Sequence, residues 1–193
     1  DSVEAEYGTD PLNIDSDLDN YSDFQEIEQG TDPLDASDHP YLGGWTIDID
    51  CRDSVVSTGN DVGEVMEHFE AVDQFGETVS SYDFCNRTLL LAAGVSEAPS
   101  LETQYQKYKE QGFMPIYLIA EDNEYNAATT EDAETWASTH GLTFPVLADS
   151  GWSIGNRFEL DNYIPSYTLI GKGMEVVEVD GDISDADIEA LLD

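Results

Sequence analysis

The sequence predicts an α/β domain, built on a mixed central sheet flanked by helices, that follows an irregular acidic N-terminal arm. Downstream of residue 62, apolar runs typical of buried strands alternate with amphipathic segments typical of helices. Upstream of residue 41, apolar residues are sparse, Lys and Arg are missing and a short motif is repeated. We therefore expect an arm over residues 1–40, a linker or cross-strap over residues 41–61 and a globular domain over residues 62–193.

The globular domain is predicted to begin with a hairpin and to continue with a βαβ unit. Apolar runs without alternation indicate strands covered on both faces, and a glycine after an amphipathic segment indicates the end of a helix. The expected elements are hairpin strands at 69–73 and 78–81, a buried strand at 88–92, a helix at 98–111 that stops at Gly112, and a second buried strand at 114–119. Two such strands joined by a helix form a βαβ unit.

The second half of the domain is predicted to alternate helices with short strands. A Gly-Lys-Gly turn between two β-rich segments indicates a hairpin, and Ser184 is a typical N-cap. The expected elements are a helix at 130–140 that ends at Gly141, a strand at 144–148, hairpin strands at 166–170 and 174–179, and a final helix with Ile188, Leu191 and Leu192 on one face.

The charge of the chain excludes several classes of partner. There are 43 Asp and Glu residues against 6 Lys and Arg, a formal net charge of −37. Such a charge repels nucleic acid phosphates and anionic lipid heads, so we expect no nucleic acid partner and no membrane insertion. Cations are the expected partners, and a salt-adapted source is the alternative explanation of the acidity.

Alternate positions of a twelve-residue loop in the arm carry oxygen ligands, the spacing of an EF-hand-type calcium site. The predicted ligands are Asp15, Asp17, Asp19, Tyr21 through its carbonyl, Asp23 and Glu26. Asn20 stands at the sharp turn where glycine is usual, and asparagine also tolerates a left-handed conformation. The sequence therefore predicts one Ca²⁺ in this loop. A solvated acidic tail is the alternative.

The motif Gly-Thr-Asp-Pro-Leu at residues 8–12 recurs 22 residues later, at residues 30–34. With the Asp-rich loop, it resembles the thrombospondin type 3-like repeats of secreted bacterial proteins, over residues 1–40. The resemblance implies calcium-dependent rigidity. It also implies supplementary calcium ligands at the junctions, namely Asp10, Asn13, Asp32 and Asp35. After Asp35 the sequence departs from the pattern, and no second full loop is expected.

The chain begins partway through a repeat, with Asp1 and Glu4 at the ninth and twelfth loop positions. Repeat units gain stability by stacking on neighbours. We therefore expect calcium-bridged self-assembly, into rings or filaments, or association with other extracellular proteins. Trimming of a longer repeat array explains the same start.

The order of elements from residue 62 resembles the thioredoxin-like superfamily, in its peroxiredoxin and secreted thiol-disulfide oxidoreductase branch. Residues 62–84 match the entry to that domain, and residues 144–170 match its second half. Pro165 stands where the family has its cis-proline. The resemblance implies a cis Ile164–Pro165 bond, with a trans proline at a strand start as the alternative.

The chain has two cysteines, Cys51 and Cys85, used either in one disulfide or as two buried free thiols. The family's cysteine pair follows the first central strand, where this chain reads Leu-Ala-Ala-Gly-Val-Ser-Glu-Ala-Pro at residues 91–99. Ser96 is a poor substitute nucleophile because no histidine is placed by motif to activate it. The resemblance puts Cys85 at the other end of that strand, so its expected partner is Cys51, in a structural disulfide.

These observations predict a secreted or cell-surface calcium-binding module that is structural or binding in role, and not an enzyme. A disulfide indicates a location outside a reducing cytosol. The alternative is a thiol-disulfide oxidoreductase or peroxidase-like enzyme that uses a non-standard site. His39, His68 and His140 lie in unrelated segments, so no catalytic role is expected for them.

Overall fold

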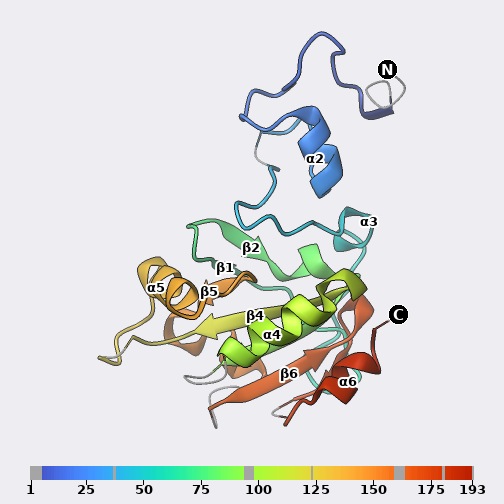
Figure 1. Ribbon diagram of the computed structural model, residues 1–193. Coiled ribbons are helices and arrows are strands. Elements are labelled where there is room, and N and C mark those ends of the chain that lie inside the picture. The colour runs from blue at the N-terminus through green and yellow to red at the C-terminus, as the bar shows by residue number, and fades with distance from the viewer. Residues whose placement is uncertain are drawn as a thin grey trace.

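A five-stranded mixed sheet forms the centre of the protein (Figure 1). The computed structural model describes residues 6–36, 38–93, 98–122, 124–158, 164–179 and 181–192. The strand order is β5-β4-β3-β6-β7. The strands are β3 (Thr88–Ala93), β4 (Phe113–Ile119), β5 (Val146–Ala148), β6 (Ser166–Ile170) and β7 (Val176–Glu178). β3, β4 and β5 are parallel, and β6 and β7 join as antiparallel strands. This arrangement confirms the thioredoxin-like α/β fold predicted from the sequence.

Three helices flank the sheet, and α4 and α6 lie in front of it in Figure 1. They are α4 (Ala98–Tyr108), α5 (Thr130–His140) and α6 (Asp185–Glu189). Five 3₁₀ segments complete this part: η1 (Ser81–Phe84), η2 (Lys109–Gln111), η3 (Ser150–Trp152), η4 (Gly155–Phe158) and η5 (Lys172–Met174). Lys107 and Gln104 of α4 each contact Asp185 of α6 at 2.8 Å, so α6 is held against α4 by polar contacts.

The ends of α5 follow directly from its sequence. Thr129 and Asp132 form a capping box, in which the threonine hydroxyl accepts from the Asp132 amide and the Asp132 carboxylate accepts from the Thr129 amide. The helix ends at Gly141, whose φ of 65° is the left-handed conformation that glycine adopts most readily. The predicted bounds of this helix agree with the structure.

A hairpin and a strap cover one edge of the sheet. The hairpin consists of β1 (Glu70–Val72) and β2 (Thr78–Ser80), paired antiparallel. The strap, which we define as residues 41–53, contains the short helix α3 (Ile49–Arg52). Trp45 and Ile47 of the strap are buried with the sheet residues, and the Trp45 indole donates to the Thr143 carbonyl at 2.9 Å. The strap is therefore packed as part of the domain core.

The arm, residues 6–36 of the described chain, extends from one end of the molecule and contains helix α2 (Asp23–Gln29) (Figure 1). Ser22 and Gln25 form the capping box that starts this helix, and Gly30 ends it with a φ of 87°. The sequence analysis did not predict α2, because its residues are mostly polar and lack an apolar stripe. No helix in the described ranges combines the length and apolar character needed to cross a membrane.

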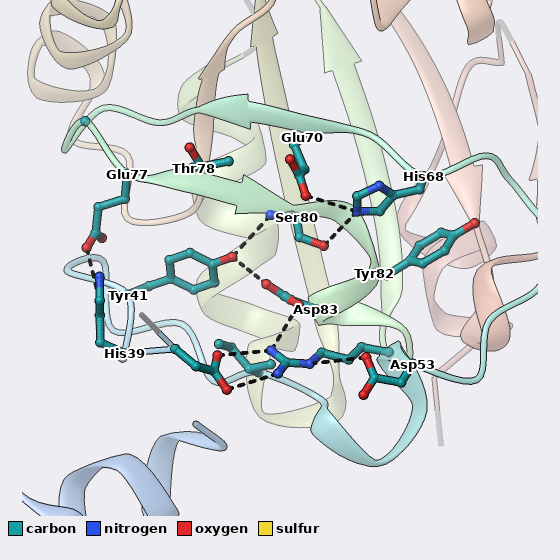
Figure 2. A pocket seen from close by; sticks show the side chains of 14 residues that line it. His39, Tyr41, Asp53, His68, Glu70, Glu77, Thr78, Ser80, Tyr82 and Asp83 are labelled. Atoms are coloured by element: carbon teal, nitrogen blue, oxygen red, sulfur yellow. Dashed lines mark hydrogen bonds and ion pairs between the residues drawn. The ribbon is translucent and has the colours of Figure 1, made fainter. Parts of the chain in front are cut away.

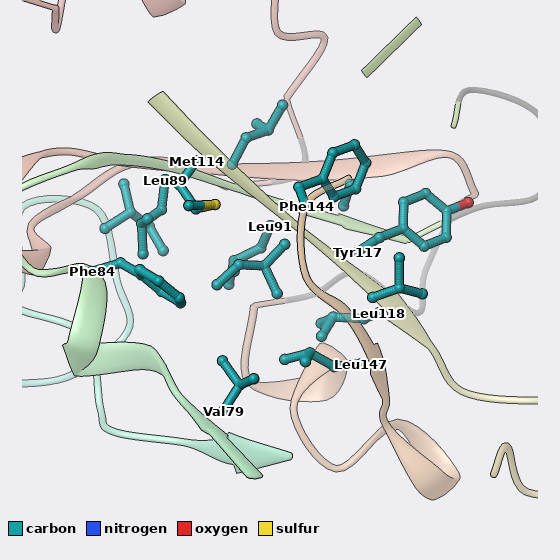
Figure 3. Close-up of a cluster of buried hydrophobic side chains, with 14 of the residues drawn as sticks. Val79, Phe84, Leu89, Leu91, Met114, Tyr117, Leu118, Phe144 and Leu147 are labelled. Carbon is teal, nitrogen blue, oxygen red and sulfur yellow. The ribbon is translucent and has the colours of Figure 1, made fainter. Parts of the chain in front are cut away.

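Large apolar side chains from both sides of the sheet meet in one cluster (Figure 3). All six positions of β3 are buried, as predicted for a strand covered on both faces. Phe84, at the end of η1, has no exposed surface and packs in this cluster beside the hairpin. The Ile164–Pro165 peptide bond, which directly precedes β6, is cis.

We predict that Phe84→Ala lowers the free energy of unfolding by about 3–5 kcal/mol, because it leaves a cavity in a close-packed core. Urea denaturation followed by circular dichroism measures the change. Phe24→Ala is the control, since Phe24 is 67% exposed on α2, and a change within about 0.5 kcal/mol is expected. Equal losses for the two variants would contradict this description of the core.

Candidate functional site

The acidic loop of the arm gathers carboxylates on one side of a tight turn. One carboxylate oxygen from each of Asp15, Asp17 and Asp19 lies within 4.8 Å of the other two. Leu18 and Asn20 adopt positive φ angles of 69° and 84°, which bend the chain between these aspartates. The Leu18 and Asn20 amides donate to the Asp15 carboxylate at 2.7 and 3.2 Å. The local backbone therefore holds like charges together.

Glu26 completes this cluster from α2. It is fully buried, and neither of its carboxylate oxygens has a hydrogen-bond partner within the part of the chain that the structure describes. Burial first, and then the charges of Asp17 and Asp19, together raise the pKa of Glu26 to about 8. One buried oxygen of Asp17 and one of Asp19 are also unpaired.

Unpaired buried carboxylate oxygens cost free energy unless a donor or a cation satisfies them. The donor set consists of oxygens alone, which suits a hard cation such as Ca²⁺ and not a softer transition metal. The loop residues therefore fit the group that the sequence pattern implies. The Tyr21 amide donates to the Asp19 carboxylate at 2.7 Å, which fixes the backbone next to the predicted carbonyl ligand.

The other predicted ligands have hydrogen-bond roles in the arm. Asp23 accepts from the Ser16 amide at 2.7 Å and from its hydroxyl at 2.9 Å, which closes the loop. Asp10 accepts from the Leu12 amide at 3.0 Å and, through its carbonyl, from the Asn13 amide at 2.8 Å. Asp32 accepts from Leu34 at 3.0 Å in the same way, 22 residues later. Metal ligation by Asp10, Asn13, Asp23, Asp32 and Asp35 stays a prediction.

The two cysteines form a disulfide between the strap and the domain. Cys51 comes from α3 and Cys85 directly follows η1, with a Cα–Cα distance of 6.1 Å. Cys85 is fully buried, whereas Cys51 is partly exposed. The Asp48 carbonyl oxygen lies 3.5 Å from Cys51 Sγ and 3.4 Å from Cys85 Sγ. Cys51 is thus the more exposed residue of the pair.

Two of the few basic residues of this acidic chain lie beside the disulfide in the sequence. Arg52 follows Cys51 and donates to both carboxylate oxygens of Asp38, at 3.2 and 3.0 Å. Arg87 stands two residues after Cys85, and its Nε lies 3.3 Å from the Asp48 carboxylate. Both guanidinium groups are thus held by carboxylates.

A polar pocket of about 720 Å³ is lined mainly by residues of the strap, the hairpin and η1, among them Arg52, which follows Cys51 in the sequence (Figure 2). The Tyr41 hydroxyl donates to the Asp83 carboxylate at 2.5 Å and accepts from the Ser80 amide at 3.1 Å. Arg52 points toward the same carboxylate, with Nη1 3.8 Å from Asp83 Oδ1. The His68 ring lies 3.0 Å from the Ser80 hydroxyl. Two pocket residues are thus close to the cysteines in the sequence, since Arg52 follows Cys51 and Asp83 stands two residues before Cys85.

The sequence analysis did not find Tyr41, Arg52 or Asp83 as a cluster. Their only signal is that Arg52 follows Cys51 and that Asp83 stands two residues before Cys85. His39 and His68 line the pocket, whereas His140 packs against Trp136 with ring centroids 4.4 Å apart. The family's usual active-site position corresponds to residues 91–99 of this chain, and residues 94–97, which include Ser96, lie outside the described residues.

Asp83 titrates abnormally in this setting. Its burial raises its pKa above the ordinary value, and the hydrogen bond from Tyr41 and the charge of Arg52 partly reverse that rise. Since the folded protein binds this proton more tightly than the unfolded chain, Asp83 costs stability as the pH rises from below 4 through its folded pKa. Removal of the Tyr41 hydroxyl raises the pKa further and increases that cost.

We predict that Tyr41→Phe lowers the free energy of unfolding by about 1–3 kcal/mol at pH 7, because a buried carboxylate loses its donor. The loss should be smaller at about pH 3, below the ordinary pKa of an aspartate, because a carboxyl whose pKa is raised is protonated there. Urea denaturation at both pH values measures it. Tyr125→Phe is the control, since Tyr125 is 85% exposed. A loss independent of pH would contradict the role of the Asp83 charge.

Solved structures with a similar fold are bacterial proteins of the thioredoxin class. A putative protein disulfide isomerase from Bacteroides thetaiotaomicron is 20% identical, with a TM-score of 0.55 over 70% of this chain and 89% of that chain. A putative thioredoxin from Neisseria meningitidis is 24% identical, with a TM-score of 0.53 over 67% and 87%. A secreted Mycobacterium tuberculosis disulfide oxidoreductase is 16% identical, with a TM-score of 0.52 over 64% and 96%. No curated protein matches the sequence.

The arm matches the bacterial TSP3 repeat at residues 1–14 and 15–36, which confirms the resemblance of this segment. The AhpC/TSA family matches residues 62–179, more than half of the chain. This match and the Cys51–Cys85 disulfide contradict the prediction that the protein is not an enzyme, because they point to an oxidoreductase. The prediction was wrong because it considered cysteines only at the family's usual position, after the first central strand. Through the domain that follows the arm and the strap, the chain belongs to the AhpC/TSA family.

Proposed function

We propose that the protein is a thiol-disulfide oxidoreductase whose redox centre is the Cys51–Cys85 disulfide. The observation that carries this proposal is that the two cysteines of the chain are joined in a disulfide, in which Cys51 is partly exposed and Cys85 is buried. The printed descriptions of the similar Bacteroides and Mycobacterium structures, a putative protein disulfide isomerase and a secreted disulfide oxidoreductase, support the same class of activity by analogy.

The proposed reaction is an exchange of two electrons with a substrate dithiol. A substrate thiolate attacks Cys51 Sγ, the Cys51–Cys85 bond breaks, and Cys85 leaves as a thiolate that takes up a proton. The second substrate thiolate then attacks the substrate sulfur of the mixed disulfide and releases Cys51. The substrate becomes a disulfide, and the cysteine pair is reduced to two thiols. A small-molecule disulfide such as glutathione disulfide restores the pair by the reverse steps.

The residues near the sulfurs have separate roles in this exchange. Arg52 and Arg87, which are close to the cysteines in the sequence, would supply positive charge that favours the thiolate form of the released cysteine. The Asp48 carbonyl lies within 3.5 Å of both sulfurs and would accept a hydrogen bond from a thiol of the reduced pair. The pocket beside Arg52 offers hydrogen-bonding groups for the polypeptide around the substrate sulfur.

We predict that the free Cys51 thiol of Cys85→Ser displaces the leaving thiolate of an activated peptide disulfide and forms a mixed disulfide, whereas Cys51→Ser forms about tenfold less, because Cys85 is fully buried. The two variants control for each other, since each keeps one thiol. Both start as free thiols, so the probe is a peptide activated as a thionitrobenzoate disulfide. Mass spectrometry of the intact protein measures the adduct. Equal trapping by the two variants, or no turnover of a dithiol peptide by the wild type in glutathione buffer, would contradict the proposal.

We also propose that the acidic loop binds one Ca²⁺. Asp15, Asp17, Asp19, the Tyr21 carbonyl and Glu26 would hold it, and the ion would neutralise carboxylates that otherwise repel one another. This binding would make the arm rigid. The repeats and the disulfide both support a secreted or cell-surface location.

For the calcium site, Glu26→Gln is expected to weaken calcium binding by about tenfold or more, because it removes one charge from a small set of ligands. Glu28→Gln is the matched control, since Glu28 is exposed on the same helix. Isothermal titration calorimetry at low salt measures both. Chelation should increase amide hydrogen exchange in the arm. Unchanged binding in Glu26→Gln or Asp17→Ala would show that the loop is not the site.

Self-assembly through the arm stays a prediction. The arm exposes several large apolar side chains: Leu12, Ile14, Leu18, Phe24 and Leu34. Such residues are available for contact with another chain.

A further inference from the structure

We infer that the calcium loop and the disulfide are thermodynamically coupled through the strap: formation of the Cys51–Cys85 bond tightens calcium binding, and bound calcium favours the disulfide. This inference rests on the proposed function, since it joins its two parts. Two sites are coupled when both bias the same structural element, and the effect of each on the other is then reciprocal. The strap is that element, because the described contacts connect it to both sites.

The arm meets the strap at the end of α2. The Ile47 amide of the strap donates to the Gln29 carbonyl at 2.9 Å. The next residue, Gly30, approaches the strap so closely that a Cβ atom there would lie 2.4 Å from the Ile47 carbonyl oxygen. The Gly30 and Thr31 amides both donate to the carbonyl of Glu26, at 2.8 and 2.9 Å. The residue that contributes the buried carboxylate to the calcium loop is thus one helical turn from the junction.

The strap meets the disulfide one residue later. Asp48 donates its amide to the Asp83 carbonyl at 2.7 Å, and its own carbonyl lies within 3.5 Å of both sulfurs. Its carboxylate accepts from the Asn86 amide at 3.1 Å. A series of contacts therefore connects Gln29 to Cys85 through Ile47 and Asp48.

A second connection runs through Arg52. This residue follows Cys51 and donates two hydrogen bonds, of 3.2 and 3.0 Å, to Asp38, which lies between the arm and the strap. Any movement of α3 after reduction therefore changes the position of the arm as well as that of the strap.

The direction of the coupling follows from the conformational ordering that calcium binding and disulfide formation each require. Calcium binding gathers mutually repelling carboxylates and needs α2 in a fixed position. The disulfide restricts the strap on which α2 rests, so part of that ordering is already present in the oxidised protein. Reduction adds two electrons and two protons to the cysteine pair, with dithiothreitol as the donor that becomes its cyclic disulfide. It leaves the strap held by non-covalent contacts alone.

The test measures calcium affinity in both redox states of the full chain. Titration calorimetry with CaCl₂ compares the oxidised protein, the dithiothreitol-reduced protein and the Cys51→Ser/Cys85→Ser variant. We expect the oxidised form to bind Ca²⁺ at least about fivefold more tightly than the reduced form and the double serine variant. A factor of about five is the lower end of typical allosteric coupling. In the reciprocal experiment, the equilibrium constant for reduction of the disulfide by dithiothreitol should be lower at saturating Ca²⁺ than in the presence of a chelator, by the same factor. Thiol labelling and mass spectrometry measure that constant.

Gly30→Ala and Gly8→Ala form a matched pair for the route. Both glycines occupy the same position of the repeat, with φ angles of 87° and 81°, so an alanine is strained in both. At Gly8 the added Cβ meets only Leu34 at 3.7 Å, whereas at Gly30 it collides with the strap. Gly30→Ala should bring the ratio of oxidised to reduced affinities close to one, and Gly8→Ala should keep it. Asp38→Asn, which weakens the Arg52 connection outside the loop, should reduce the ratio even if Gly30→Ala folds poorly.

Several outcomes would overturn the inference. Calcium binding of equal affinity in both redox states would overturn the coupling and leave the calcium site and the reactive disulfide of the proposed function intact. A ratio that Gly30→Ala and Asp38→Asn both leave unchanged would overturn the strap as its route. Calcium binding to neither form would overturn the calcium part of the proposed function, and the coupling with it.

Discussion

The position of Asp48 in the strap is the constraint on which the rest of the structure depends. Its amide is bonded to the Asp83 carbonyl, its carboxylate to Asn86 and Arg87, and its carbonyl lies against both sulfurs of the disulfide. One residue thus fixes the strap to the chain segment that leads into β3. Since Ile47 holds the end of α2, the arm takes its position from the same segment.

The distribution of charge explains why the strap has this role. The chain carries only 6 Lys and Arg residues against 43 acids, so most carboxylates have no basic partner. Arg52 and Arg87 are used where the arm and the strap meet the domain, and Lys107 is used between α4 and α6. No Lys or Arg occurs before Arg52. The carboxylates of the loop therefore depend on cations from solvent, and burial of Glu26 makes that dependence stronger.

The sheet and its main helices could be predicted from the sequence because their patterns are local. The apolar run of β3 and the capping residues of α5 specify those elements without knowledge of the rest of the chain. Helix α2 has local caps but no apolar stripe, so its sequence did not indicate a helix. Helix α3 has no side-chain cap and is held by the disulfide, which spans 34 residues. The pocket was missed for the same reason. Tyr41 and Asp83 are 42 residues apart and neither has a motif.

The location of the disulfide also changes how the family resemblance should be read. In this fold the two ends of β3 are different environments. Ala93, at the carboxyl end, pairs with Ser166 beside the cis Pro165, whereas Thr88, at the amino end, follows Cys85 by three residues. Every residue of β3 between these ends is buried, so the buried strand separates the cysteine pair from the cis-proline. In the proposed reaction, a cysteine pair at the amino end would not use the cis-proline edge to bind a substrate. Its specificity would come from the strap, which lies outside the residues that match the family, and from the polar pocket that the strap helps to line.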